Sequence, residues 1–269
     1  MDPESILPGA VKSEEQHRRD ICLAGKWIYE HGHVASTDGN ISVRLGPDRI
    51  LASPTCVSKG TMTPDDLVIT DLEGRLISGT RKPSSELGMH LLIYKLRPDV
   101  NAVCHAHPPV ATGYAAAGIA LDKPILCELV IGLGSVPVAR YGTPGTSELT
   151  AQIEPLVHGH DAILMANHGV VTYGPDLLTA YHRMETTEHF ARVSLVTELL
   201  GKQNLLSNRE VEKLLVARAR YGAGAQTAAP ANGDRPAAPE TDATARVTLT
   251  RRELEAIVDE AVQKDRARR

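Results

Sequence analysis

Two histidines, His105 and His107, stand one residue apart in the segment AVCHAHPP, residues 102–109. Successive side chains of a β-strand point to opposite faces, so in a strand both imidazoles would lie on one face, roughly 6.5–7 Å apart. Two imidazoles at that separation can converge on one metal ion, with bonds of about 2.0–2.1 Å each. An isolated His-x-His motif is more often two hydrogen-bonded histidines at a strand end than half of a metal site, so other residues must decide between these interpretations.

Two further residues extend this pair to a candidate metal-binding set. His168 lies in ANHG, residues 166–169, where an apolar segment ends at a glycine. A third imidazole at a strand end is what a three-ligand catalytic zinc site requires. Glu86 ends KPSSE, residues 82–86, and begins a helical segment, where a carboxylate can also simply complement the helix dipole. The four residues together indicate a metal site built from the ends of strands and a helix.

Three short turns carry the groups that anions bind. They read TDGN at residues 37–40, SPT at 53–55 and PSS at 83–85. Such turns present backbone N–H groups and hydroxyls, and the third leads into a helix N-terminus, which favours phosphate. Ordinary turn chemistry accounts for any one of them taken alone. The glycine-rich signatures of P-loops and dinucleotide-binding folds are absent from the sequence.

The segments around these residues predict an α/β protein. Short β-rich segments bounded by Gly, Asp or Pro indicate antiparallel strands at 41–45, 49–53, 66–72 and 75–79. Buried or partly buried strands are predicted at 101–107, 134–141 and 161–169, the last ending at Gly169. Helices are predicted at 13–32, 85–98, 107–118, 147–158, 175–201 and 208–222. These elements place the three histidines near strand ends.

Composition excludes several other classes of protein. The chain has 269 residues, 42% of them hydrophobic, which is enough for a full core. A net charge of −4 argues against a nucleic-acid-binding protein with a broad basic face. The sequence shows neither a signal-peptide pattern nor an apolar run of membrane-spanning length, and we expect a cytoplasmic protein. The four cysteines, at positions 22, 56, 104 and 127, form no CxxC pair and are predicted to be free thiols.

The chain divides into three parts by composition. Residues 1–221 are predicted to form one domain. Residues 222–247 are rich in Ala, Pro, Gly and Thr and nearly free of large apolar side chains, so they are predicted to be a flexible linker. Residues 248–269 begin with a possible capping box, Thr250 to Glu253, and are predicted to form a short amphipathic tail helix.

Five ordered segments within residues 21–222 resemble the class II aldolase/adducin family, most closely its bacterial L-fuculose-1-phosphate aldolase branch. They are TDGNISVR, SPTCVSKGTMTPDDLVITDLEG, KPSSELGMHLLIYKLRPDVNAVCHAHP, VPVARYGTPGTSEL and ILMANHGVVTYG. The resemblance implies a three-layer α/β/α fold with a central, mainly antiparallel sheet. It also implies a homotetramer with active sites between subunits.

The same resemblance implies roles for individual residues. Zinc would be held by His105, His107 and His168, although three imidazoles and a carboxylate also suit Mn²⁺, Fe²⁺ or Co²⁺. Glu86 would ligate the metal at rest and leave it to act as the catalytic acid/base. The substrate phosphate would be held by Thr37, Asn40, Thr55, Ser84 and Ser85. Tyr221 matches a family tyrosine near the active site.

Three positions distinguish this chain within the family pattern. Glu86 favours an aldolase, because the related ribulose-phosphate 4-epimerases carry Asp in this motif. Cys56 replaces the glycine of a Pro-Thr-Gly phosphate turn, where a Cβ crowds the ligand if the backbone needs positive φ. Glu128 stands where the aldolases place a tyrosine, contributed by the neighbouring subunit, that protonates the aldehyde oxygen. Glu128 is therefore either a substitute proton donor or the mark of another substrate.

The expected function is that of a zinc-dependent aldolase. It would reversibly cleave a ketose 1-phosphate, similar to L-fuculose 1-phosphate, into dihydroxyacetone phosphate and an aldehyde through a metal-stabilised enediolate. Alternatives on the same scaffold are a sugar-phosphate epimerase, a dehydratase, or an aldolase with another substrate. A non-catalytic adducin-like module is less expected, since such modules lose the metal ligands that this chain keeps.

Overall fold

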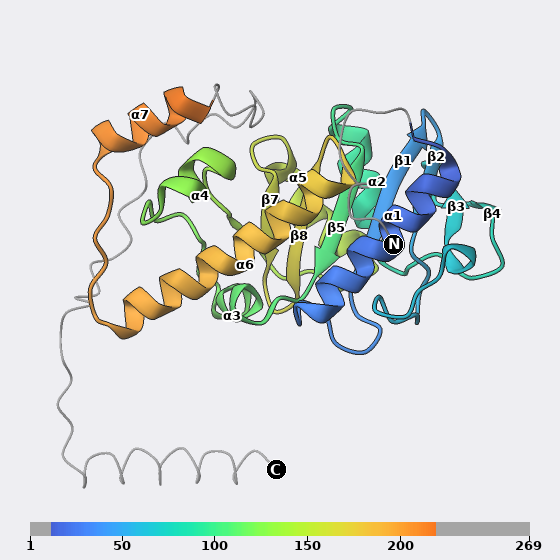
Figure 1. Cartoon of the computed structure of the whole chain (residues 1–269), viewed down its shortest axis with the longest axis horizontal. Helices are drawn as coiled ribbons and strands as arrows, with labels where there is room; N and C mark the ends of the chain where they lie inside the picture. Colours follow the sequence, from blue (N-terminus) through green and yellow to red (C-terminus); the bar gives the residue numbers. More distant parts are fainter. Residues whose placement is uncertain (1–11, 219–269) are drawn as a thin grey trace, which may run out of the picture. The chain divides into compact units, whose positions relative to one another are not determined.

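Eight strands form one sheet in the order β4-β3-β2-β1-β5-β8-β7-β6 (Figure 1). The structure is a computed structural model that describes residues 12–218, so Tyr221, the predicted linker and the predicted tail helix lie outside the described residues. Neighbouring strands of this sheet are antiparallel except β6 and β7, which are parallel. The strands are β1 (Asn40–Gly46), β2 (Arg49–Ala52), β3 (Val68–Thr70), β4 (Leu76–Ser78), β5 (Ala102–Ala106), β6 (Val138–Ala139), β7 (Ala162–Met165) and β8 (Gly169–Gly174).

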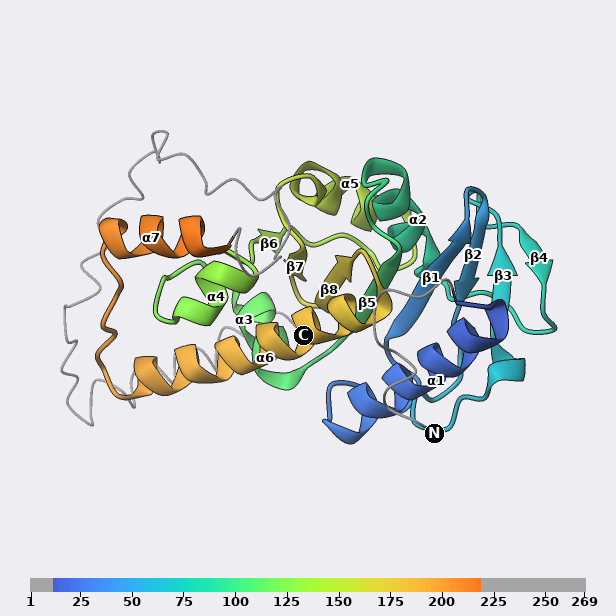
Figure 2. The ribbon, with the colours of Figure 1, turned by 45° about the horizontal axis from the view of Figure 1, so that its top comes forward.

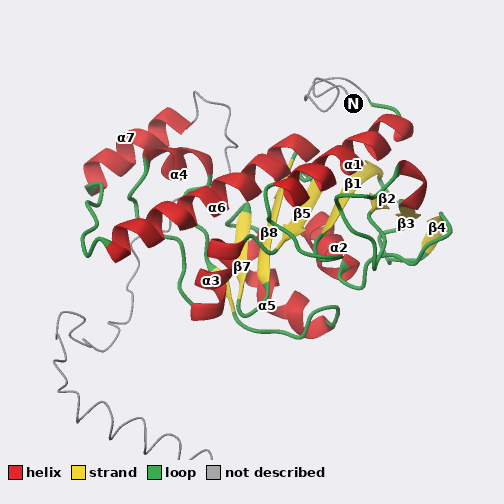
Figure 3. Ribbon diagram, turned by 60° about the horizontal axis from the view of Figure 1, so that its bottom comes forward, coloured by secondary structure: helices red, strands yellow, loops and turns green. Residues whose placement is uncertain are grey.

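Helices cover both faces of the sheet, which confirms the predicted α/β/α architecture (Figures 2 and 3). α2 and α5 pack on one face, and α1, α3 and α6 pack on the other. The helices are α1 (Glu14–Glu30), α2 (Leu87–Leu96), α3 (Pro109–Ala117), α4 (Cys127–Gly132), α5 (Ser147–Val157), α6 (Leu177–Leu199) and α7 (Asn208–Arg218), with a short 3-10 helix, η2 (Pro64–Asp66). None of the described helices is long and apolar enough to cross a membrane.

Two hydrophobic cores meet at the central strands. In β5, Val103 belongs to the core under α2 and α5, whereas Cys104 belongs to the core under α1, α3 and α6. Both faces of this strand are therefore buried, which explains why its sequence is continuously apolar rather than alternating. By the same alternation, His105 points to the face that α2 covers. The strand that carries His105 is thus fixed by packing on both sides.

The structure corrects several predicted boundaries. Residues 169–174 form strand β8, although the sequence predicted that the preceding strand continues to Gly169. The reversal occurs at Asn167, which has a φ of 57°, a left-handed conformation that asparagine tolerates better than most residues. The predicted strand at 134–141 shortens to β6, and α4 was not predicted. All four cysteines are free thiols, as predicted.

Candidate metal centre and substrate turns

The three predicted histidines converge at one end of the central strands. His105 lies in β5, His107 follows that strand, and His168 lies in the turn between β7 and β8. Because β5 pairs with β8, this turn lies next to the end of β5. The turn packs tightly: a Cβ at Gly169 would lie 2.5 Å from Cδ2 of His107. The ring centroids are 4.8–5.1 Å apart, and one nitrogen of each ring lies within 4.8 Å of the others.

A hydrogen bond behind the ring of His105 and a nearby carboxylate behind the ring of His107 leave the Nε2 atom of each ring facing the centre. Nδ1 of His105 donates to the carbonyl oxygen of Val170 at 2.9 Å, which leaves the lone pair on Nε2. Nδ1 of His107 lies 3.6 Å from a carboxylate oxygen of Asp38. The two Nε2 atoms are 3.1 Å apart. A metal ligand commonly has such a partner on its outer nitrogen, and Asp38 is one that the sequence did not single out.

Glu86 faces the same centre. It occupies the N-cap position of α2, but its carboxylate makes no capping hydrogen bond. Its Oε2 lies 3.3 Å from Nε2 of His105, and its Oε1 lies 3.0 Å from Nε2 of His168. The Oε1 contact is short but is not aligned as a hydrogen bond, so this buried oxygen has no hydrogen-bond partner among the described residues.

These distances fit a divalent cation. Ligands of a tetrahedral zinc ion, with bonds of about 2.0–2.1 Å, lie roughly 3.3 Å from one another. The separation between Nε2 of His105 and Nε2 of His107, and those from Glu86 to Nε2 of His105 and of His168, are 3.0–3.3 Å and agree with that value. The ligand nitrogens of all three rings lie within 4.8 Å of one another. A buried carboxylate oxygen without a hydrogen-bond partner, beside the nitrogens of three imidazoles, is the arrangement that a cation between them would satisfy.

The electrostatics of the cluster favour the forms that ligate metals. Burial opposes ionisation of Glu86, but the positive charge that His105 and His168 carry when protonated outweighs it and lowers the pKa of the carboxyl well below its usual range. Burial, reinforced by the other two histidines, lowers the pKa of His107 to about 4. At neutral pH the carboxylate is therefore ionised and His107 is a neutral imidazole, as metal binding requires.

The three predicted anion-binding turns lie beside Glu86. Pro54 and Pro83 form an isolated β-bridge, and the N–H of Thr55 donates to the carbonyl oxygen of Lys82 at 3.1 Å. Ser84 Oγ accepts from the N–H of Glu86 at 3.3 Å. Of the predicted phosphate residues, Thr37 and Ser85 are exposed, Thr55 and Ser84 are partly buried, and Asn40 is buried. The structure thus places Asn40, Thr55, Ser84 and Ser85 around the start of α2, whereas Thr37 precedes them in the turn that leads to Asn40.

A buried ammonium group bridges the turn at residues 37–40 and the segment that follows the turn at residues 53–55. Nζ of Lys59 donates to the carbonyl oxygens of Thr37, at 3.0 Å, and Val57, at 2.6 Å. The residue is only 1% exposed, and burial lowers the pKa of its ammonium to about 8. The sequence analysis missed Lys59. The signal was present, because a lysine that closely follows a small hydroxyl-bearing turn can supply charge for an anion.

Comparison with known proteins decides the family. Residues 19–195 match the profile described as Class II Aldolase and Adducin N-terminal domain. The chain belongs to this family. It is similar to the 5-deoxy-D-ribulose 1-phosphate aldolase of Bacillus thuringiensis, with 35% identity over 77% of this chain and 98% of that protein. It is also similar to the 3-oxo-tetronate 4-phosphate decarboxylase of Haemophilus influenzae, with 34% identity over 71% of this chain and 91% of that protein.

A solved structure gives the same result. The chain matches an L-fuculose 1-phosphate aldolase with a TM-score of 0.71 and 28% identity, covering 77% of this chain and 98% of that one. Membership of the class II aldolase and adducin family, together with aldolase relatives at this level of identity, makes the protein an enzyme of the lyase class.

Cys56 keeps a glycine-like backbone in this family member. Its φ is 57°, in the left-handed region, and its side chain is exposed. The turn therefore has the conformation for which glycine is best suited, at the position where the family pattern usually has glycine. Cysteine fills the position at the expense of backbone strain.

Replacing Cys56 with glycine is expected to stabilise the protein. The left-handed conformation costs a non-glycine residue about 1–2 kcal/mol, and glycine loses about 0.5–1 kcal/mol more chain entropy on folding, so the free energy of unfolding should rise by about 0.5–1 kcal/mol. Urea denaturation of C56G measures this change. C56A is the matched control, because it removes the thiol but keeps the Cβ and should show no gain. Equal gains in both variants would mean that the thiol, not the backbone, causes the strain.

Glu128 lies on a different part of the subunit. It is exposed on α4, which packs against α6 and α7 (Figure 2). Its carboxylate accepts a hydrogen bond from Sγ of Cys127 at 3.1 Å, and this bond lowers the pKa of Glu128. Within one chain the structure does not bring Glu128 to the histidines. Its predicted role, as a residue that a neighbouring subunit contributes, stays a prediction, as does the role of Tyr221.

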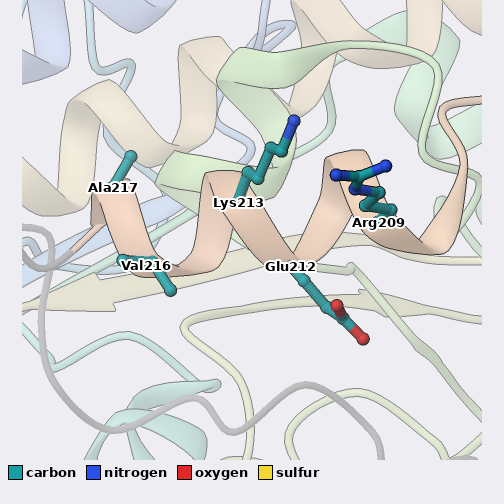
Figure 4. Close-up of a pocket in the computed structure, with 5 residues that line it drawn as sticks. All are labelled: Arg209, Glu212, Lys213, Val216 and Ala217. Atoms are coloured by element: carbon teal, nitrogen blue, oxygen red, sulfur yellow. The ribbon is translucent and has the colours of Figure 1, made fainter.

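Two hollows differ in their relation to the histidine cluster. A cavity of about 390 Å³ reaches Glu86 and is lined by one side of α2, by Ser85 just before it and by the start of α5, including Ser147. Another, of about 420 Å³, runs along α7 and is lined by Arg209, Glu212, Lys213, Val216 and Ala217 (Figure 4). All five of these residues come from one helix and none was predicted to act in the site. The cavity beside Glu86 therefore borders the candidate site, although none of the three histidines lines it.

Proposed function

We propose that this enzyme is a metal-dependent aldolase that reversibly cleaves a ketose 1-phosphate into dihydroxyacetone phosphate and an aldehyde. One observation carries the proposal: Glu86 stands between the three-histidine cluster on one side and the anion-binding turns on the other. A base, a metal site and a phosphate seat within one short region are the parts that this reaction needs. Similarity to aldolases that act on 1-phosphates supports the choice of substrate.

His105, His107 and His168 hold the metal, with Glu86 as a fourth ligand at rest. Zinc suits three imidazoles and a carboxylate, and Mn²⁺, Fe²⁺ or Co²⁺ are the alternatives. When bound, the cation acts as a Lewis acid that stabilises negative charge developing on the substrate oxygens. Imidazole ligates a metal in its neutral form, so three such ligands leave the positive charge of the cation available for that purpose.

Glu86 transfers a proton from and to the carbon that is C3 of the ketose. In the condensation direction its carboxylate removes a proton from the hydroxymethyl carbon of dihydroxyacetone phosphate. The electron pair left on that carbon attacks the aldehyde carbon, the C3–C4 bond forms, and the aldehyde oxygen takes up a proton. Cleavage is the reverse, with Glu86 returning the proton to C3.

The turns at residues 37–40, 53–56 and 83–85 hold the phosphate. Their backbone N–H groups and hydroxyls are the donors, and Lys59 supplies positive charge beneath them. The phosphate lies away from the bond that breaks, so its binding energy serves to orient the reacting carbon. In the homotetramer that the family resemblance implies, Glu128 completes the site of a neighbouring subunit, and Tyr221 lies near an active site.

Decarboxylation of a 3-oxo acid phosphate is the second candidate. The similarity to a 3-oxo-tetronate 4-phosphate decarboxylase, at 34% identity, favours it specifically. Loss of carbon dioxide from such an acid and cleavage of a ketose 1-phosphate leave the same enediolate of dihydroxyacetone phosphate. The two reactions differ in the group that departs. In the implied homotetramer the departing group lies next to Glu128 of a neighbouring subunit, which this chain has in place of the family tyrosine.

The full-length protein, loaded with zinc, should condense dihydroxyacetone phosphate with at least one short aldehyde. Product is measured by chromatography across a panel of aldehydes, with 3-oxo-tetronate 4-phosphate tested in parallel for release of carbon dioxide. Unphosphorylated dihydroxyacetone should react at least about 100-fold more slowly, because it cannot use the phosphate seat for orientation. Carbon dioxide release without condensation would replace the aldolase with the decarboxylase. Absence of both reactions would contradict both the aldolase and the decarboxylase proposals.

A further inference from the structure

A chain of four buried polar side chains lies behind Glu86, and beyond Asn40 its members have no part in the proposed chemistry. It begins at Asn40, whose side-chain amide lies between Glu86 and His90. Nδ2 of Asn40 donates to Oε2 of Glu86 at 3.0 Å, and Oδ1 of Asn40 lies 2.5 Å from Nε2 of His90. Asn40 is 4% exposed, and its amide is occupied on both sides. A predicted phosphate residue therefore directs its side chain to the base.

The chain continues away from the site through Ser42 and Tyr94. Nδ1 of His90 lies 2.7 Å from Oγ of Ser42, and Oγ of Ser42 lies 2.8 Å from the hydroxyl of Tyr94. None of these three side chains is more than 1% exposed. The arrangement follows from the two secondary structures: Asn40 and Ser42 alternate onto one face of β1, and His90 and Tyr94 are four residues apart on α2.

The hydrogen-bonding capacity of these side chains allows only one assignment of donors and acceptors. The carboxylate of Glu86 only accepts hydrogen bonds, so Asn40 must present its NH₂ to it and its carbonyl oxygen to His90. Nε2 of His90 must then carry the hydrogen. Burial lowers the pKa of His90 to about 3, so the ring is neutral and its Nδ1 accepts from the hydroxyl of Ser42. Ser42 in turn accepts from Tyr94, and every donor points towards Glu86.

We propose that His90 is a positioning residue: by donating to Oδ1 of Asn40, it holds the Asn40 amide in the one orientation that presents an N–H group to Oε2 of Glu86. Without that donor the amide can rotate and offer its oxygen to the carboxylate, which repels it. The Asn40 amide also gives Oε2 a partner when the carboxylate leaves the metal to move a proton. This inference rests on the proposed function, because it concerns how the proposed base is oriented.

Two substitutions of His90 test its hydrogen bond to Asn40 separately from its hydrogen bond to Ser42. H90Q keeps an N–H donor that reaches as far as Nε2 of the ring, and so can still hold the amide of Asn40. H90N reaches only as far as Nδ1, so it keeps a partner for Ser42 but loses the donor to Asn40. Y173F is a control for the loss of a buried hydrogen bond elsewhere, since the hydroxyl of Tyr173 bonds the carbonyl oxygens of Val157 and His160.

The readouts are zinc affinity, from competition with a chelator, and the kcat and KM of hydrogen exchange into dihydroxyacetone phosphate. Substitution of a residue that supports a metal ligand typically costs about 10–100-fold in affinity or activity. H90N is therefore expected to lower kcat by about 10–100-fold, with KM nearly unchanged, and to weaken zinc binding by about tenfold. H90Q should restore both quantities to within about threefold of the parent protein, and Y173F should leave both unchanged although it lowers the melting temperature.

Equal losses in H90N and H90Q, or equal losses in H90N and Y173F, would overturn the proposal and leave His90 as a packing residue. A parent protein that exchanges no hydrogen would instead refute the proposed function. The zinc affinities of H90N and H90Q would still decide the role of His90 in that case, because they do not depend on turnover.

Discussion

Replacing His105 with alanine is expected to abolish metal binding under ordinary purification conditions. His105 is fully buried, and its Nε2 lies within 3.3 Å of both Glu86 and His107. If the roughly 10–16 kcal/mol typical of a four-ligand zinc site is shared among its ligands, each contributes about 3 kcal/mol, so affinity should fall at least about 100-fold. Elemental analysis after dialysis should show about one zinc per subunit in the parent protein and almost none in H105A.

The matched control is His158→Ala. His158 is an exposed histidine at the end of α5, outside the cluster, and its removal should leave zinc content unchanged. Zinc content in H105A equal to that of the parent protein would remove His105 from the ligand set. It would also require another explanation for the close approach of the three rings.

Replacing Glu86 with glutamine is expected to preserve metal binding but to stop proton transfer at C3. Glutamine has nearly the same shape, and the three imidazoles remain to hold the metal, so affinity should fall by about tenfold at most. An amide cannot accept the C3 proton, so exchange of that hydrogen with solvent should slow by about 10²–10⁴-fold. Proton NMR of dihydroxyacetone phosphate in deuterium oxide measures the exchange directly.

Glu154→Gln serves as the control, because Glu154 is exposed on α5 and should not affect exchange. Exchange at the parent rate in E86Q would exclude Glu86 as the base, whatever its position. Loss of zinc from E86Q, together with loss of exchange, would instead assign Glu86 a role as a metal ligand alone.

The sequence predicted the parts of the site that depend on local geometry. A strand with a period of two residues puts His105 and His107 on one face, and the structure has their ring centroids 4.9 Å apart. This is closer than the spacing of alternate side chains, because His107 lies beyond the end of β5. The convergence of Glu86 and His168 depends on the strand order and on the turn at Asn167, which spacing along the chain does not reveal.

Other parts of the site were hidden because their sequence patterns resemble ordinary core or surface positions. His90 lies on the buried face of α2 beside apolar neighbours, so it is indistinguishable from a core residue until Asn40 and Ser42 are placed opposite it. Lys59 stands in a polar turn, where lysine is usually exposed. Strand β8 was missed because the reversal at Asn167 requires a left-handed residue that no glycine or proline marks.

The most direct test of the account is hydrogen exchange into dihydroxyacetone phosphate by the parent protein with and without metal. We predict exchange of the hydroxymethyl hydrogen at C3 when zinc is bound, loss of that exchange after chelation, and its return when zinc is restored. Exchange that is equally fast in the stripped protein, or no exchange with one zinc bound per subunit, would contradict the claim that Glu86 and the three histidines form a metal-assisted aldolase site.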